Sequence, residues 1–215
     1  MPWPAIVLSE TLERYVRAEQ AVQSLGFTAA WLPAVMPPAA ATDHAWAHVG
    51  NQRTGRGCPL TGENGLRVAH RNAWKHIAML QTPMAVFEDD VVATTGNVEV
   101  VDACLKRAQG YDVAFLSEGP AMLFATTAAL WVTPRAARWL LHNTSVCQPS
   151  RHRGIDHNVA LGCRQRLLHC LHAVRHGNLS DGGGRYFGVG VFVQDRVGVR
   201  PYLHQASNRQ IGRGR

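Results

Sequence analysis

The chain of 215 residues has no long apolar run and no block of basic residues. No stretch approaches the roughly 20 apolar residues that a membrane-spanning helix needs. The first residues lack a basic segment followed by a long apolar one, which argues against a signal peptide. Lysine and arginine never occur five in a row, so no nucleic-acid-binding tail is evident. We therefore expect a cytoplasmic protein with no transmembrane segment and no nucleic-acid partner, although contact with a membrane surface remains open.

Cysteine is scarce and carries no recognisable pairing pattern. The five cysteines are an odd number and form no Cys-x-x-Cys pair. A disulfide framework of the secreted kind is therefore not expected. Cys163, Cys170 and His172 lie near one another, but their spacing fits no common zinc pattern. We expect the cysteines to be free thiols, namely Cys58, Cys104, Cys147, Cys163 and Cys170.

The composition is that of a folded, basic protein. Hydrophobic residues make up 46% of the chain and charged residues 17%, which is enough apolar surface for a sizeable core. The formal net charge of +7 favours anionic partners such as phosphorylated small molecules, nucleic acid or an anionic membrane, without choosing among them. The length fits one domain, predicted at residues 1–203, followed by a basic tail at 204–215.

The spacing of apolar residues predicts alternating strands and helices. Residues 4–8 are typical of a buried strand, the helix that follows ends at Gly26, and residues 27–35 form a second strand. Such a strand, helix and strand open an α/β fold, here with a central, mostly parallel sheet flanked by helices. Further helices are expected at 61–81, 97–109, 134–141 and 155–172, and further strands at 84–87, 112–116, 124–133 and 186–193.

Three consecutive acids, Glu88, Asp89 and Asp90, follow the apolar strand at 84–87. In an extended strand, Glu88 and Asp90 share one face and Asp89 points to the other. Open α/β sheets bind ligands at the carboxyl ends of their strands. Hard carboxylate oxygens suit Mn²⁺ or Mg²⁺, with coordination positions left for phosphate oxygens. The sequence therefore predicts a metal site, and a cluster of solvated acids is the alternative.

A glycine-rich turn leads into the helix that precedes this strand. Glu63 and His70 are seven residues apart, about two helical turns, so they can face the same side. The first turn of the helix offers free backbone N–H groups to a phosphate or hydroxyl.

Together these segments resemble glycosyltransferase family 25, the lipooligosaccharide and collagen galactosyltransferases. The family's Gly-Glu-x-Gly-x-x-x-x-His-x-x-x-Trp-x-x-Ile stretch is followed by a strand that ends in Glu-Asp-Asp. The chain departs from the family at Val7, Leu66 and Ala69, where Asn, Cys and Ser are usual. The matching positions are Gly62, Glu63, Gly65, His70, Trp74, Ile77, Glu88, Asp89 and Asp90, with looser matches at 6–8, Arg14, 32–35, 129–141 and 155–156.

The resemblance implies a GT-A type fold and a metal-dependent, inverting transfer of a sugar from a nucleotide-diphospho-sugar to a glycan hydroxyl. Galactose is the commonest sugar of the family, so UDP-galactose is the expected donor and lipopolysaccharide biosynthesis the expected setting. The expected metal is Mn²⁺ or Mg²⁺, held by Glu88 and Asp90, with His204 as a further candidate ligand. The expected donor contacts are Arg14, His70, Glu88 and Asp89.

Inversion requires a base that deprotonates the acceptor hydroxyl. Asp156 is the candidate, with a helix-capping acid as the alternative interpretation. Glu63 is the second candidate. Two other hypotheses for the whole chain are a catalytically inactive glycosyltransferase-like protein and a basic nucleic-acid-binding module, although the latter lacks a recognisable motif.

Overall fold

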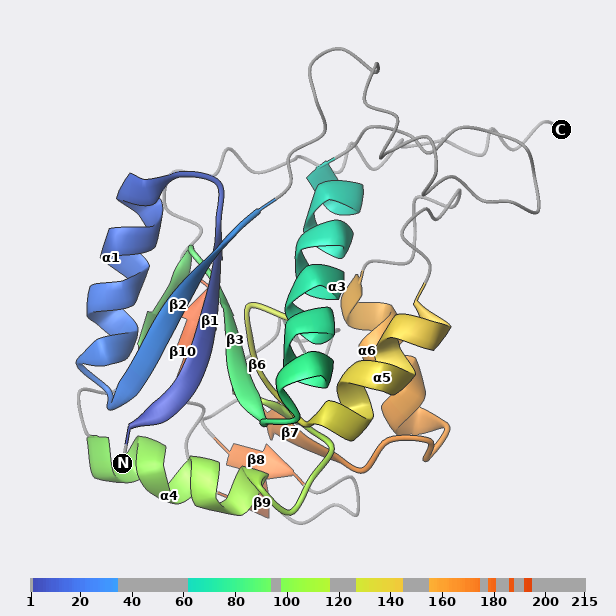
Figure 1. Cartoon of the computed structure of the whole chain (residues 1–215). Coiled ribbons are helices and arrows are strands. Elements are labelled where there is room, and N and C mark those ends of the chain that lie inside the picture. The colour runs from blue at the N-terminus through green and yellow to red at the C-terminus, as the bar shows by residue number, and fades with distance from the viewer. Residues whose placement is uncertain are drawn as a thin grey trace, which may run out of the picture.

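The computed structural model describes residues 2–34, 62–93, 98–116, 127–144, 155–174, 178–180, 186–187 and 192–194. Within these ranges, helices cover both faces of an eight-stranded sheet, which confirms the α/β class (Figure 1). The proposed tail at 204–215 lies outside the described residues.

The sheet has the strand order β2-β1-β3-β6-β5-β7-β8-β9. β1 is parallel to both β2 and β3, and β5 is parallel to β7, whereas β6 is antiparallel to β3 and to β5. The sheet is therefore mixed rather than mostly parallel, because β6 is inserted between two strands of the opposite direction. The strands are β1 Trp3–Ser9, β2 Phe27–Pro33, β3 Met84–Glu88, β5 Val113–Phe115, β6 Ala129–Val132, β7 Cys170–Val174, β8 Asn178–Ser180 and β9 Tyr186–Phe187.

A second, two-stranded sheet is formed by β4 (Val91–Ala93) and β10 (Phe192–Gln194), which pair antiparallel. β4 follows β3 after two residues, so the chain leaves the main sheet directly at the acids. The predicted final strand at 186–193 is thus two strands in different sheets.

Five described helices form two layers. α1 (Leu12–Gln23) and α4 (Val98–Ala108) pack on one face of the sheet, and α3 (Gly62–Leu80), α5 (Pro134–Asn143) and α6 (Ile155–Arg164) pack on the other. α1 and α5 begin with threonine caps, Thr11 and Thr133, whose side chains accept a hydrogen bond from a backbone N–H of the first turn.

Alternation along β3 explains why both faces are covered. Ala85 and Phe87 lie in the core beneath α1 and α4, while Met84 and Val86 lie in the core beneath α3, α5 and α6. A strand that is buried on both sides reads as a continuous apolar run, as this one does.

The leucine spacing of segment 155–172 predicts one continuous helix, and this prediction is wrong. α6 ends at Arg164, and β7 begins at Cys170. Between them, Arg166 has a φ of 57°, a left-handed conformation that no helix continues through.

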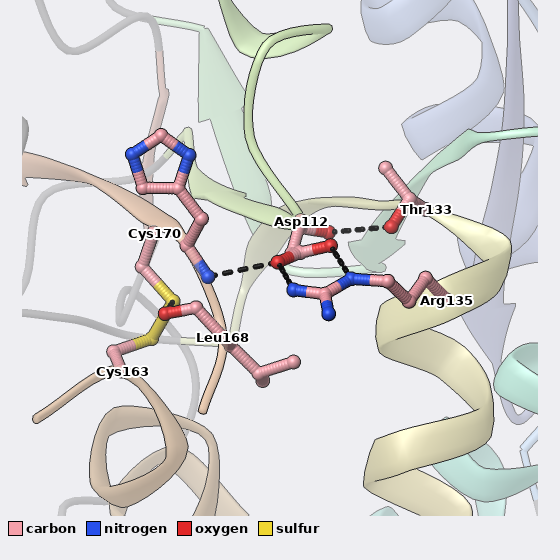
Figure 2. Close-up of a disulfide and its surroundings, with 7 residues drawn as sticks. Asp112, Thr133, Arg135, Cys163, Leu168 and Cys170 are labelled. Carbon is pink, nitrogen blue, oxygen red and sulfur yellow. Dashed lines mark hydrogen bonds and ion pairs between the residues drawn. A yellow bond between two sulfur atoms is a disulfide. The ribbon is translucent and has the colours of Figure 1, made fainter. Parts of the chain in front are cut away.

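The free-thiol prediction is wrong for two cysteines. The turn after α6 brings the Cα atoms of Cys163 and Cys170 within 5.5 Å of each other, and the pair forms a disulfide (Figure 2). Cys104 is a buried free thiol. Cys58 and Cys147 lie outside the described residues. No described helix combines the length and the apolar composition needed to cross a membrane.

Candidate functional site

The three acids lie where the strand order of the sheet reverses. β2 lies on one side of β1 and β3 lies on the other, and all three strands run in the same direction. Their carboxyl ends, and the starts of α1 and α3, lie at the upper end of Figure 1. In open α/β sheets this topological switch point is where ligands bind.

Glu88 is the last residue of β3, and its side chain faces the α3 layer. His70 Nε2 lies 3.1 Å from Glu88 Oε1. The hydroxyl of Thr127 donates to the same oxygen at 2.9 Å. Between these partners the Glu88 side chain is only 13% exposed. Glu88 is therefore a carboxylate held in one orientation at the edge of the core.

Asp89 faces the opposite layer and pairs with α1. Arg14 Nη2 donates to Asp89 Oδ1 at 2.5 Å, and the Asp89 side chain is 9% exposed. Arg14 also lies 3.7 Å from Glu10, and its side chain is 37% exposed. The Arg14 side chain thus combines an ion pair to a nearly buried acid with partial exposure to solvent.

Asp90 lies in the turn between β3 and β4, and its Oδ1 is buried. Because β3 ends at Glu88, the alternation of an extended strand does not govern the direction of Asp90.

The motif residues of α3 divide into two groups. Trp74 and Ile77 are fully buried in the core between α3 and the sheet, so their place in the motif is explained by packing. His70 is also fully buried, but its polar atom contacts an acid of the strand end. Ala69, where glycosyltransferase family 25 usually has Ser, lies in the core as well, with no exposed surface.

Several predicted site residues cannot be placed in this geometry. Glu63 is the second residue of α3 and Asp156 the second residue of α6, but their side chains lie outside the described part of the structure. His204 lies outside the described residues altogether.

Sequence reasoning missed two buried polar residues, one that bonds Glu88 and one on α3. Thr127 is 1% exposed and bonds Glu88, yet it stands alone before an apolar strand, with no pattern to mark it. Arg67, one helical turn before His70, is fully buried, which is rare for a guanidinium because charge is costly to desolvate. The sequence signal for Arg67 is a long basic side chain at a position on the apolar stripe of α3.

The described carboxylates at the end of β3 do not enclose a metal ion by themselves. Among the described residues, no three His, Cys, Asp or Glu side chains gather closely enough to hold an ion by themselves. Mg²⁺ is commonly bound through one or two carboxylates together with substrate phosphates. Glu88 and Asp90 carry hard carboxylate oxygens of the kind that Mg²⁺ binds, and among the described residues both side-chain hydrogen bonds to Glu88 end on Oε1.

A hollow of about 520 Å³ lies at the opposite end of the sheet from the acids, beside the amino end of β3. Its two arginines, Arg135 and Arg138, and its acid, Asp112, form hydrogen bonds with neighbouring side chains. Arg135 forms a two-pronged ion pair with Asp112 (Figure 2), and Arg138 donates to Gln81. These bonds join β5, α5 and the start of β7, which is a structural role.

Comparison with known proteins identifies no family for the chain. No protein-family model and no curated protein sequence matches the chain. Among solved structures, the chain is similar to "Crystal Structure of A197 from STIV", at 10% sequence identity and a TM-score of 0.39, over 88% of this chain and 94% of that one.

Proposed function

We propose that the chain is a metal-dependent glycosyltransferase of the GT-A type, which transfers a sugar from a nucleotide-diphospho-sugar to a glycan hydroxyl. One observation carries the proposal. The two sequence segments that resemble glycosyltransferase family 25, the motif of α3 and the acids after β3, meet through the His70–Glu88 contact at the topological switch point. UDP-galactose is the donor that the resemblance favours.

In this proposal, Glu88 and Asp90 hold Mn²⁺ or Mg²⁺ together with the phosphates of the donor, and His204 is a further candidate ligand. A bound divalent ion neutralises the charge that builds up on the diphosphate leaving group. Arg14 lies at the same end of the sheet with its side chain partly exposed, and in the proposal it contacts a donor phosphate while Asp89 restrains it.

The base that accepts the proton of the acceptor hydroxyl is assigned to Asp156. This residue lies in the first turn of α6, on the side of the sheet that α3 also covers. Glu63, in the first turn of α3, is the second candidate for this role.

A thermal-shift screen tests the proposal. UDP-, GDP- and dTDP-sugars are each added with and without Mn²⁺. A ligand that binds only the folded state at 100 times its Kd stabilises it by about 2.7 kcal/mol. For a chain of this size that corresponds to a rise in Tm of roughly 5–10 °C. We expect such a rise for one donor, and only when the metal is present.

Asp90→Ala is the informative variant, with Glu13→Ala as its matched control because the Glu13 side chain is 84% exposed on α1. We expect Asp90→Ala to fold and to lose the metal-dependent rise, while the control keeps it. A folded Asp90→Ala protein that still responds to metal and donor would reject the metal site. Absence of a rise with every donor in the wild type would favour an inactive relative, and salt-sensitive DNA binding would favour the nucleic-acid-binding alternative.

A further inference from the structure

Two buried donors converge on a single oxygen of Glu88. His70 Nε2 and Thr127 Oγ1 both bond Glu88 Oε1, at 3.1 and 2.9 Å. His70 is 0% and Thr127 1% exposed, so water does not replace either donor. Because an ionised carboxylate only accepts hydrogen bonds, His70 Nε2 carries a proton in this contact.

The donors come from separate parts of the fold, which makes the arrangement rigid. His70 lies in the middle of α3, and Thr127 lies just before β6. The backbone N–H of Glu88 donates in addition to the carbonyl of Ala128 at 2.8 Å. The backbone N–H and the side-chain carboxylate of Glu88 are thus both bonded to neighbouring elements. The rotational freedom of the side chain is therefore lost on folding rather than on ligand binding.

Because both donors bond the same oxygen, the two carboxylate oxygens of Glu88 have different roles. Among the described residues, the side-chain donors bond Oε1, so Oε2 is the oxygen to which the binding of a cation is assigned. Carboxylates that ligate metals are in turn hydrogen-bonded by a surrounding set of residues, and loss of such a partner lowers metal affinity about 10- to 100-fold.

We infer that His70 and Thr127 are positioning residues that orient Glu88 Oε2 toward the metal–diphosphate group of the donor. The inference rests on the proposed function. It gives His70 a role different from direct contact with the donor, because the imidazole is fully buried and reaches the site only through Glu88.

The test is a paired substitution at Thr127. Thr127→Val keeps the shape of the side chain and removes the donor, while Thr127→Ser keeps the donor. Titration calorimetry measures the Kd of Mn²⁺ in the presence of UDP, GDP or dTDP, each in parallel, well below the Tm of every variant. We expect the Kd to rise about tenfold or more in Thr127→Val and to stay near the wild-type value in Thr127→Ser.

A second pair of substitutions, at His70, tests the inference independently if the Thr127 variants fail to fold. Glutamine carries an amide donor near the position of Nε2, so His70→Gln should retain more metal affinity than His70→Leu. A merely structural role would lower the Tm of these variants and leave the Kd unchanged.

The outcomes separate the inference from the proposed function. If the wild type binds Mn²⁺ with a nucleoside diphosphate and the folded Thr127→Val and His70→Leu variants bind it equally well, the positioning role is overturned and the proposed function stands. If the wild type binds no Mn²⁺ with any of the three nucleotides, the proposed function fails, and the positioning role fails with it.

Discussion

At the residue scale, Asp112 is a buried carboxylate whose charge is compensated on several sides. Arg135 Nε donates to its Oδ1 at 2.7 Å, and the backbone N–H of His169 donates to its Oδ2 at 2.8 Å (Figure 2). The guanidinium of Arg135 is the main cause that lowers the pKa of Asp112 below its ordinary value, against the opposing effect of burial. The ionised form is therefore the one that the fold selects.

This pairing predicts an acid-sensitive contribution to stability. A carboxyl group whose pKa is depressed in the folded state stabilises the protein above its unfolded pKa of about 3.9, and the contribution is lost as pH falls through the lower folded pKa. We expect Asp112→Asn to lower the free energy of unfolding by about 2 kcal/mol at pH 7, and to flatten its fall below pH 4.

Urea unfolding between pH 7 and pH 2.5 measures both effects. Glu13→Gln serves as the control, because Glu13 is exposed and its ion pair with Arg17 is a surface contact. Equal pH dependence of Asp112→Asn and the wild type would show that the carboxylate of Asp112 is not a source of acid sensitivity.

The same scale shows why only part of the site is readable from the sequence. The acids and His70 stand out because a polar group that follows or interrupts an apolar pattern is conspicuous. Thr127 is one ordinary threonine, and it becomes part of the site only because the antiparallel insertion of β6 places it beside the end of β3. Partners that depend on strand order cannot be inferred from local spacing.

At the scale of elements, α5 and α6 are held together by a close contact at a glycine. A Cβ atom added to Gly162 of α6 would lie 2.7 Å from two ring carbons of Trp139 in α5, and 3.1 Å from Leu168. Real Cβ atoms do not approach other atoms so closely, so the indole or the helix has to move. Gly162 therefore sets the spacing of this helix pair.

We expect Gly162→Ala to destabilise the protein by about 1–3 kcal/mol, the usual cost of overpacking, in spite of the better helix propensity of alanine. Gly110→Ala is the matched control, because its Cβ would lie 3.6 Å from the carbonyl of Arg107, an ordinary contact. Thermal unfolding measures the stability of the two variants relative to the wild type. A Gly162→Ala protein as stable as Gly110→Ala would mean that Trp139 moves aside at no cost.

Elements with a regular apolar period were predictable, and those set by a single backbone conformation were not. The predicted helix at 61–81 differs from α3 by one residue at each end, because its stripe of core residues is continuous. The end of α6 was missed because Leu167 and Leu168 continue a helical spacing into the turn. Only Leu168 of this pair is buried, and the left-handed Arg166 between the helix and the strand leaves no apolar signature.

At the scale of the whole molecule, the Cys163–Cys170 disulfide fastens the end of α6 to the start of β7, next to the Asp112 network (Figure 2). α6 contributes Ile155 and Val159 to the core that α3 shares with the sheet. The bond thus attaches α6, the helix that carries Asp156, to β7, a strand separated from β1 by β3, β6 and β5. Disulfides persist in oxidising compartments and are rare in the cytosol, so the stability of this protein depends on where it resides.

Reduction of this bond is expected to lower the free energy of unfolding by roughly 2–3 kcal/mol, the loop-closure value for a loop of this length. For a chain of this size the Tm should fall by about 5–10 °C. Differential scanning calorimetry with and without dithiothreitol measures the change, in a Cys58→Ser, Cys147→Ser background that prevents exchange with those two thiols. Cys104 does not compete, because burial raises the pKa of its thiol to about 11 and leaves little thiolate at pH 8.

The Cys163→Ser, Cys170→Ser variant in the same background supplies the control. It should unfold near the Tm of the reduced protein and show no response to dithiothreitol. If the oxidised parent and this variant unfold at the same temperature, the packing of α6 against α5 and the core holds the helix in place without the bond. A lower Tm for the variant, matched by reduction of the parent, would show that the stability of the fold that holds α6, and the proposed base on it, depends on the redox state of its surroundings.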